Sequence, residues 1–247
     1  ILEELSRDAT VGQHKFAEFL FNGHPYGRRI LGKMPTVEKI SAADVVAHYK
    51  NHFGKDRLLI VGAGDTKTAV LQKWKDDLSA RLGDSALPQV KVDQPQMGTT
   101  KRLQIVDKPE RTQTQIDIGQ IGVRPTDADF FPLYVANHAF GGRSFQARLM
   151  TEIRVKRGWS YGAYSDFRFG LKPRSWQIHL FPASKDAAPA LKTTLAMISD
   201  WREKGLSPEE FEFSKKSLLN SCGFLYGTPR KRLENKILEK TLDLPDG

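Results

Sequence analysis

The sequence predicts an α+β fold in which a linker separates two folded segments. Apolar residues recur at helical spacing in several stretches, and shorter stretches between them alternate or run apolar as strands do. Residues 84–100 show neither pattern and are rich in polar residues, Pro and Gly, which is typical of a linker. We therefore expect one folded segment over residues 1–83 and a second over residues 101–247.

In the first segment, the clearest local signal is a helix start. Ser41 is a favourable N-cap, and Asp44 stands three residues further on, close to a capping box. An apolar run that ends in Gly-Ala-Gly-Asp predicts a short strand after this helix. The elements expected here are helices over 1–22, 41–52 and 70–83, and a strand over 58–61.

In the second segment, the strongest signal lies at residues 206–211. Ser207 can cap a helix that begins at Pro208, and Glu210 can return a hydrogen bond to the Ser207 backbone. The spacer at residues 170–174 suits a hairpin between two strands. The expected elements are strands over 103–106, 113–121, 159–169 and 175–181, and helices over 127–140, 145–153, 188–204, 208 onward and 230–242.

Composition limits the classes of function. The 247 residues carry a formal net charge of +9 and one cysteine, Cys222, so an internal disulfide and a multi-cysteine zinc site are excluded. No apolar run approaches the roughly 20 residues of a transmembrane helix, and no signal peptide is visible. The chain starts within an apolar pattern and without Met, as a portion of a longer protein would. The bases are scattered without a nucleic-acid-binding motif, so we expect a solvated surface and no nucleic-acid partner.

The histidines and glycines offer weak candidates for a site. His48 and His52 have the spacing of zinc ligands on one helix, but Lys50 between them would repel a cation and no third ligand is evident. We interpret them as surface or half-buried histidines. The Gly141-Gly142 turn lacks the Gly-Lys-Ser/Thr ending of a phosphate loop, so we interpret it as a turn before the next helix.

Residues 149–162 carry the most information about function. They leave a helix through Gly158 and enter a strand, so Arg154 and Tyr161, seven residues apart, could meet across the turn. Arginine supplies a planar fork of N–H donors and tyrosine a hydroxyl, a pair suited to holding a peptide carbonyl or carboxylate. An exposed arginine beside a packed tyrosine is the plainer alternative.

Three segments resemble the pitrilysin/insulinase (M16) family of zinc metallopeptidases, to which the mitochondrial processing peptidases are related. They are residues 24–65, residues 140–149 and residues 154–165, and the resemblance covers nearly the whole chain. It implies an M16-like α/β sandwich: residues 1–83 would end a first domain, and residues 101–247 would form most of a second, non-zinc domain that is truncated at its C-terminus. Arg154 and Tyr161 match the family's substrate-contacting pair, which implies that they bind substrate.

The sequence departs from the family in the absence of a His-x-x-Glu-His zinc motif. That motif would lie upstream of Ile1. Glu4 falls near the place of the family's third zinc ligand, although a solvent-facing residue at a helix start is the favoured interpretation. We therefore expect no catalytic or metal-binding residue in this chain, and zinc only in the complete enzyme or in an active partner subunit.

Two functions follow from the resemblance. In the first, the chain is the peptide-binding part of a zinc metalloendopeptidase, inactive alone, in which Arg154 and Tyr161 orient the substrate and stabilise the oxyanion. Its partners would be a peptide or unfolded polypeptide and an M16 subunit with the zinc motif, in a homodimer or heterodimer. In the second, it is a non-catalytic structural or interaction subunit of the same fold. The resemblance implies the periplasm or cell envelope of a bacterium.

Overall fold

The protein is described by a computed structural model that covers residues 6–142 and 144–244. The chain forms two compact units: residues 1–30 with 94–220, and residues 31–93 with 221–247. Residues 84–100 contain no helix or strand. The predicted division into two related domains, 1–83 and 101–247, stays a prediction. None of the described helices is long and apolar enough to cross a membrane.

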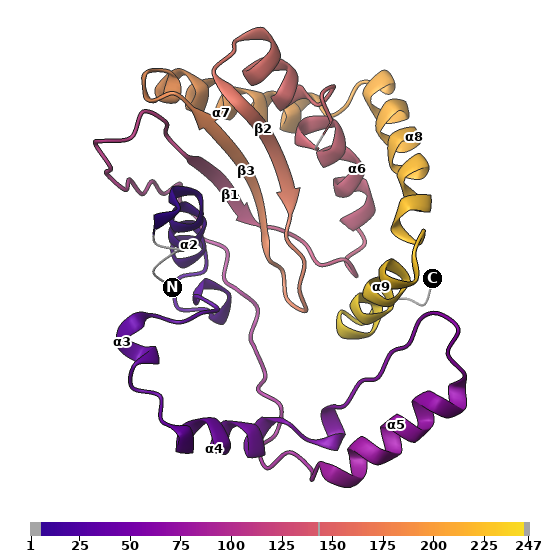
Figure 1. Ribbon diagram of the computed structural model, residues 1–247. Coiled ribbons are helices and arrows are strands. Elements are labelled where there is room, and N and C mark those ends of the chain that lie inside the picture. The colour runs from indigo at the N-terminus through magenta and orange to yellow at the C-terminus, as the bar shows by residue number, and fades with distance from the viewer. Residues whose placement is uncertain (1–5, 143, 245–247) are drawn as a thin grey trace. The chain divides into compact units, whose positions relative to one another are not determined.

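The first unit is built on a three-stranded antiparallel sheet with the strand order β1-β3-β2 (Figure 1). The central strand β3 pairs with both neighbours, and its His179 lies opposite Asp117 of β1 and Tyr164 of β2. The predicted hairpin joins β2 to β3. The strands are β1 (Ile116–Ile121), β2 (Ser160–Phe167) and β3 (Ser175–Pro182).

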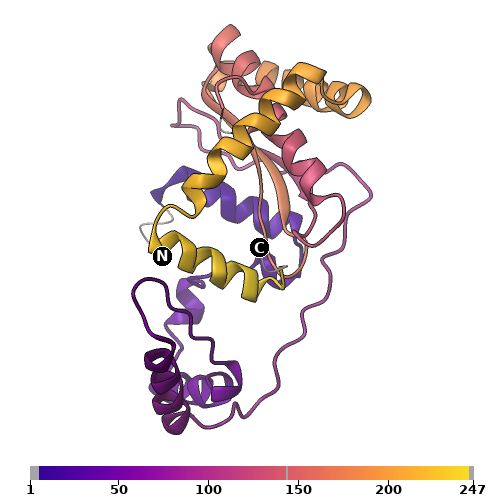
Figure 2. The same cartoon turned by 90° about the vertical axis from the view of Figure 1, so that its right-hand side faces the viewer.

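One face of this sheet forms the core. Ile178 and Leu180 of β3 and Ala163 of β2 are fully buried and pack with Phe140 and Ile153 from the helices. Figure 2 shows α6 and α7 on this side of the sheet and α2 on the other. The covering helices are α6 (Phe130–Gly141), the π-helical turn η3 (Met150–Lys156) and α7 (Ala187–Lys204).

The opposite face of the sheet is polar, and α2 (Asp8–Leu20) lies against its β1 edge. Gly119 makes this approach possible. A Cβ atom at this position would lie 2.3 Å from the Trp176 carbonyl oxygen and 2.8 Å from the ring of Phe16 on α2. Because side chains alternate along a strand, Asp117 and His179 point to this polar face.

The second unit is helical in its described residues. The predicted capping box that opens α4 is confirmed: the Asp44 amide donates to Ser41 Oγ at 3.2 Å, and the Ser41 amide donates to Asp44 Oδ2 at 2.8 Å. No residue of α4 or α5 is buried. The helices are α3 (Met34–Val37), α4 (Ala42–His52), α5 (Thr68–Arg81) and α9 (Pro229–Thr241), with the 3₁₀ turn η2 (Lys55–Arg57).

The second predicted capping box opens helix α8. Ser207 caps α8 as predicted, because the Glu210 amide donates to Ser207 Oγ at 3.2 Å and the Ser207 amide donates to the Glu210 carboxylate at 2.8 Å. Arg148 holds the same carboxylate through two of its nitrogens. Further helical elements are η1 (Pro25–Gly27), η4 (Ser184–Asp186) and α8 (Pro208–Leu225).

Two predicted strands, at residues 58–61 and 103–106, are wrong. The structure gives both segments an irregular backbone with no partner strand among the described residues. Leu103 and Ile105 are 76% and 79% exposed. An apolar run has no stable strand conformation of its own, because its stability comes from pairing and packing against neighbouring strands.

Candidate functional site

Arg154 lies in the π-helical turn η3, and the chain reverses direction just after η3. Ile153 is fully buried in the core, and Arg154, the next residue, projects to the surface side of the same turn. Gly158 has φ +64°, a left-handed conformation that suits glycine, and its amide donates to the Arg154 carbonyl oxygen at 3.0 Å. The chain therefore reverses at Gly158 and passes back beside Arg154 as it enters β2.

Arg154 and Tyr161 meet across this turn, as the sequence suggested. The guanidinium carbon of Arg154 lies 4.6 Å from the centre of the Tyr161 ring. Tyr161 itself is 82% exposed, so the alternative of a packed tyrosine is wrong. The contact places the Arg154 guanidinium against the ring of an exposed tyrosine, and the role of the two residues in substrate binding stays a prediction.

Phe145 is the third member of this cluster, and the sequence analysis missed its position. Its ring centre lies 4.9 Å from the Arg154 guanidinium carbon. The sequence predicted a helix over residues 145–153, but Phe145 lies outside the helical segment and is 65% exposed. The reason is local: residues 144–147 form turns, and helical structure begins only at residue 148. No pattern in the sequence signals this contact.

No carboxylate among the described residues pairs with the Arg154 guanidinium. Glu152 is the acidic residue of this turn, and it pairs with Arg157 at 2.8 Å and with Lys156 at 3.2 Å. The hydrogen bonds from Arg157 and then Lys156 hold the pKa of Glu152 below its usual value. Arg154 has no carboxylate partner in the described part of the chain, so its N–H donors remain available to a ligand.

The glycine pair before this site serves close packing. A Cβ atom on Gly141 would lie 2.3 Å from Ser165 Oγ, and one on Gly142 would lie 2.7 Å from the His138 carbonyl oxygen. Ser144 Oγ accepts a hydrogen bond from the Gln146 amide at 3.2 Å. These contacts let the end of α6 approach β2 closely, which agrees with a turn before the next helical segment.

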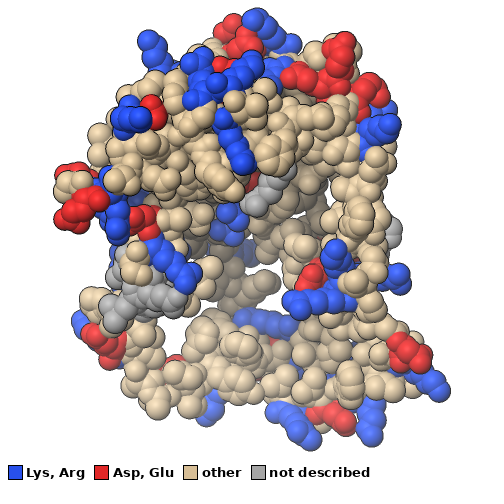
Figure 3. All heavy atoms as spheres, turned by 45° about the horizontal axis from the view of Figure 1, so that its top comes forward, with Lys and Arg blue, Asp and Glu red and all other residues tan. Residues whose placement is uncertain are grey.

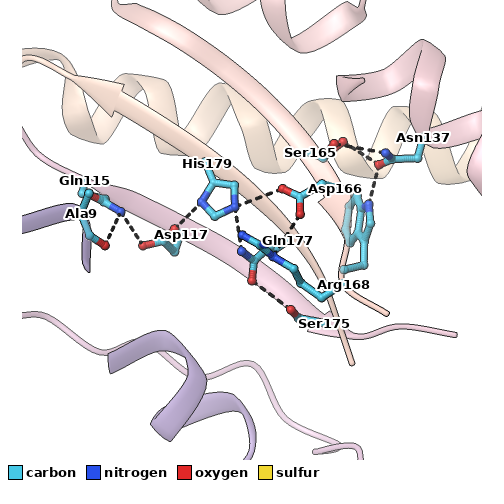
Figure 4. Close-up of polar contacts among 11 residues, drawn as sticks. Ala9, Gln115, Asp117, Asn137, Ser165, Asp166, Arg168, Ser175, Gln177 and His179 are labelled. Atoms are coloured by element: carbon cyan, nitrogen blue, oxygen red, sulfur yellow. Dashed lines mark hydrogen bonds and ion pairs between the residues drawn. The ribbon is translucent and has the colours of Figure 1, made fainter. Parts of the chain in front are cut away.

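A buried network of polar groups lies on the polar face of the sheet (Figure 4). His179 Nδ1 lies 2.7 Å from Asp117 Oδ1, and His179 Nε2 lies 3.3 Å from Asp166 Oδ2. The Gln177 amide is 2.7 Å from Nε2. Burial alone would lower the pKa of His179, but hydrogen bonds to Asp117 and Asp166 outweigh it and raise the pKa to about 9. His179 is therefore a buried cation between two carboxylates.

A second set of hydrogen bonds joins the sheet to α6. Asn137 Nδ2 donates to the Ser165 carbonyl oxygen at 3.2 Å. Asn137 Oδ1 accepts from Ser165 Oγ at 2.6 Å and from Trp176 Nε1 at 2.7 Å. Most side chains of both networks are buried, and their hydrogen bonds fix the three strands and α6 to one another. Sequence alone gave no motif around His179, because its partners come from three different strands.

Zinc, which the resemblance implies for the complete enzyme, does not fit the residues described here. No group of three or more His, Cys, Asp or Glu within residues 6–142 and 144–244 is arranged to hold a metal ion. The rings of His48 and His52 lie 4.5 Å apart, without a third ligand of this kind. Glu4, the other candidate, lies outside the described residues.

Curated proteins with related sequences include a processing-peptidase subunit and a non-peptidase homolog. The chain is 30% identical over 199 residues to the mitochondrial-processing peptidase subunit beta of Blastocladiella emersonii, covering 78% of this chain and 42% of that protein. It is 25% identical over 231 residues to the non-peptidase homolog YmxG of Helicobacter pylori, covering 92% of this chain and 52% of that protein. The chain thus spans about half the length of these relatives.

The fold has solved counterparts. The crystal structure of a peptidase M16 inactive domain from Pseudomonas fluorescens matches with a TM-score of 0.86 and 21% identity, covering 98% of this chain and 57% of that chain. This likeness confirms the predicted M16-like α+β fold. A family model described as the peptidase M16 inactive domain matches residues 39–218, which is more than half of the chain. The chain therefore belongs to the peptidase M16 inactive domain family.

Proposed function

We propose that this chain is the peptide-binding part of an M16 zinc metalloendopeptidase and that it cleaves no peptide by itself. One observation carries the proposal: the Arg154 guanidinium lies against the exposed Tyr161 ring without a carboxylate partner among the described residues. A guanidinium in this state can donate two parallel hydrogen bonds to a carboxylate, or one to a peptide carbonyl. The hydroxyl of the exposed Tyr161 ring offers a further donor.

The aromatic contacts support this role energetically. Both Phe145 and Tyr161 lie against the Arg154 guanidinium, so they restrict its motion before a peptide arrives. Less side-chain entropy is then lost on binding, which strengthens each hydrogen bond that the arginine makes. In the complete enzyme, the same donors would stabilise negative charge that develops on the scissile carbonyl oxygen.

The zinc site in this proposal belongs to another part of the complete protein or to a partner subunit. The support is that the sequence has no His-x-x-Glu-His motif and that the described residues hold no group of three suitable ligands. A homodimer or heterodimer of M16 subunits would bring the two functions together. We place this assembly in the periplasm or cell envelope of a bacterium, which cell fractionation would test.

The second candidate function is a structural or interaction subunit that takes no part in catalysis. The relative from Helicobacter pylori, named a non-peptidase homolog, favours this alternative, because the alignment covers 92% of this chain. Under this function Arg154 and Tyr161 would be surface residues without a ligand. The two candidates therefore differ in whether the chain binds extended peptide through these two side chains.

Peptide binding to the purified chain distinguishes them. The probe is a fluorescein-labelled, reduced and carboxymethylated polypeptide, and fluorescence anisotropy gives Kd. Arg154→Ala should weaken binding about tenfold to hundredfold, because a hydrogen bond to a charged group contributes about 1.5–3 kcal/mol. Arg154→Lys should fall between wild type and Arg154→Ala, since lysine keeps the charge but loses the planar fork.

Arg157→Ala is the matched control. Arg157 lies next to η3, and its guanidinium contacts the Trp159 ring at 4.6 Å, but it is already paired with Glu152. Its replacement should leave Kd within about twofold of wild type, because Arg157 has no free donor role in the proposal. Equal Kd values for wild type and Arg154→Ala, with both proteins folded, would favour the structural subunit.

A further inference from the structure

Strand β2 contains one more residue than β3 beside the candidate site. Ser160 pairs with Pro182, and Ala163 pairs with Leu180, so three steps along β2 match two steps along β3. Tyr161 and Gly162 together therefore lie opposite one residue, Phe181, which defines a β-bulge.

The bulge decides which way Tyr161 points. Ala163 is fully buried on the core face of the sheet. In a regular strand, side chains two residues apart share a face, so Tyr161 would also point to the core. The extra residue breaks that alternation. Ser160 takes the buried position at 4% exposure, and Tyr161 turns outward at 82% exposure. The contact with Arg154 therefore depends on the bulge.

The side chain of Ser160 closes the bulge from inside. Its Oγ accepts a hydrogen bond from the Phe181 amide at 2.8 Å and donates one to the Gly162 carbonyl oxygen at 2.6 Å. A bulge interrupts the ladder of backbone hydrogen bonds, and a buried backbone group that loses its partner costs free energy. One hydroxyl thus satisfies a donor on β3 and an acceptor within the bulge of β2.

We propose that Ser160 is a positioning residue that holds the bulge and thereby presents Tyr161 beside Arg154. Ser160 touches no substrate and acts only through Tyr161, so its effect on peptide binding rests on the proposed function. Alanine at this position removes both hydrogen bonds and leaves the Phe181 amide and the Gly162 carbonyl without this bridge. The strand then relaxes toward regular pairing, and Tyr161 moves away from the Arg154 guanidinium.

A double-mutant cycle in the full chain tests this inference with the same labelled polypeptide. Ser160→Ala should weaken binding about threefold to tenfold in the wild-type background, as coupled neighbours typically do. It should have no further effect when Tyr161→Ala is already present. Ser160→Thr should restore binding to near the wild-type value, because it keeps the hydroxyl. All variants are compared at a temperature where circular dichroism shows them folded.

Ser175→Ala provides the matched control. Ser175 is 5% exposed on the neighbouring strand and donates to Gln177, away from the bulge. This variant should lose stability without a change in peptide Kd. A purely structural role for Ser160 predicts the same behaviour for both alanine variants, and that result would overturn the inference. So would a loss of binding by Ser160→Ala that persists in the Tyr161→Ala background.

A second readout tests the geometry without a peptide. The Tyr161 ring should displace the NMR signals of the Arg154 side-chain protons, and Tyr161→Ala should remove that displacement. Ser160→Ala should change these signals in the same direction and speed hydrogen exchange at the Phe181 amide. Unchanged Arg154 signals would overturn the inference even if peptide binding fails for every variant. Loss of binding in Arg154→Ala together with wild-type binding in Ser160→Ala would overturn it and leave the proposed function standing.

Discussion

At the scale of single residues, Arg154 differs from its basic neighbours in what surrounds it. Lys156 and Arg157 share the carboxylate of Glu152, whereas Arg154 lies against two aromatic rings. An ion pair neutralises a basic side chain, but an aromatic ring leaves its N–H edge open. In the sequence, Arg154 and Arg157 differ only in position, and the difference in their partners appears only in the folded structure.

Phe145 gives a prediction at this scale. Phe145→Ala should weaken binding of the labelled polypeptide about twofold to fivefold, because an exposed cation–π contact contributes about 0.5–1 kcal/mol. The melting temperature should stay within about 2 °C of wild type, since the side chain is 65% exposed. Anisotropy titrations and thermal unfolding measure the two effects.

Phe131→Ala is the control for this change. Phe131 is 71% exposed on α6 and contacts the Phe130 ring, with its centre 5.1 Å away. Its removal deletes a similar exposed ring without touching Arg154, so Kd should not change. The assignment of Phe145 to the site would be wrong if both variants bound the polypeptide equally well.

At the scale of elements, pairing between strands creates contacts that no single strand contains. Asp117, Asp166 and His179 come from β1, β2 and β3, and they meet because antiparallel register aligns the three strands. Tyr164 and Gln177 also contact the imidazole. The resulting cation between two carboxylates is enclosed, with His179 only 2% exposed.

Stability should therefore depend on pH through His179. Its pKa is about 9 in the folded chain and about 6.5 when unfolded, so the folded state binds the proton more tightly. The stabilisation is fully present below about pH 6.5 and is lost as pH rises through about 9. A difference of about 2.5 pKa units corresponds to about 3 kcal/mol. Urea unfolding at pH 6, 7.5 and 9 should show this decline.

His179→Gln is the variant that isolates the effect. Glutamine cannot carry the proton, so the variant should be less stable at pH 6 and should lose most of the pH dependence between about 6.5 and 9. The two carboxylates then lack a cation between them, which places the largest difference from wild type at the lower pH values. An unchanged slope in the variant would show that another group causes the pH dependence.

Helix starts behave differently from strands at this scale. The capping boxes at Ser41 and Ser207 form as predicted, because each depends on residues only three positions apart. The hairpin between β2 and β3 also forms as predicted, because a short connection joins its two strands. The runs at residues 58–61 and 103–106 failed as strands, since a strand needs a partner that is distant in sequence.

At the scale of the whole molecule, the distribution of charged side chains agrees with the predicted solvated surface. The formal net charge is +9, yet on the face drawn in Figure 3 basic and acidic side chains are interspersed. We continue to expect no nucleic-acid partner, and a filter-binding titration with DNA at low and high salt would check it. The chain belongs to the M16 inactive domain family and covers about half of the two relatives named above, so its assembly with other M16 segments is the property to test.

Complementation is the prediction at this scale. The purified chain should bind no stoichiometric zinc and should cleave no fluorogenic peptide. Addition of an M16 subunit that carries His-x-x-Glu-His should produce activity, and Arg154→Ala in this chain should lower kcat/KM of the mixture about tenfold to hundredfold. Metal analysis, peptide assays and size-exclusion chromatography measure zinc, activity and assembly.

Arg157→Ala again serves as the control for assembly and turnover. Zinc and activity in the chain alone would contradict the proposal and would make Glu4 a candidate ligand. If Arg154→Ala leaves the activity of the assembled complex unchanged, residues other than Arg154 bind the substrate. A complex without activity in any combination would support the non-catalytic subunit.

The sequence by itself determined part of the local structure and the family resemblance. Helix caps, the hairpin and the match of Arg154 and Tyr161 to the family pair all depend on residues close together in the chain. Only the tertiary structure decided how distant residues combine: the carboxylates around His179, the place of Phe145 and the bulge closed by Ser160. The physical reason is that strand register and burial are set by pairing and packing across the fold, which no short stretch of sequence contains.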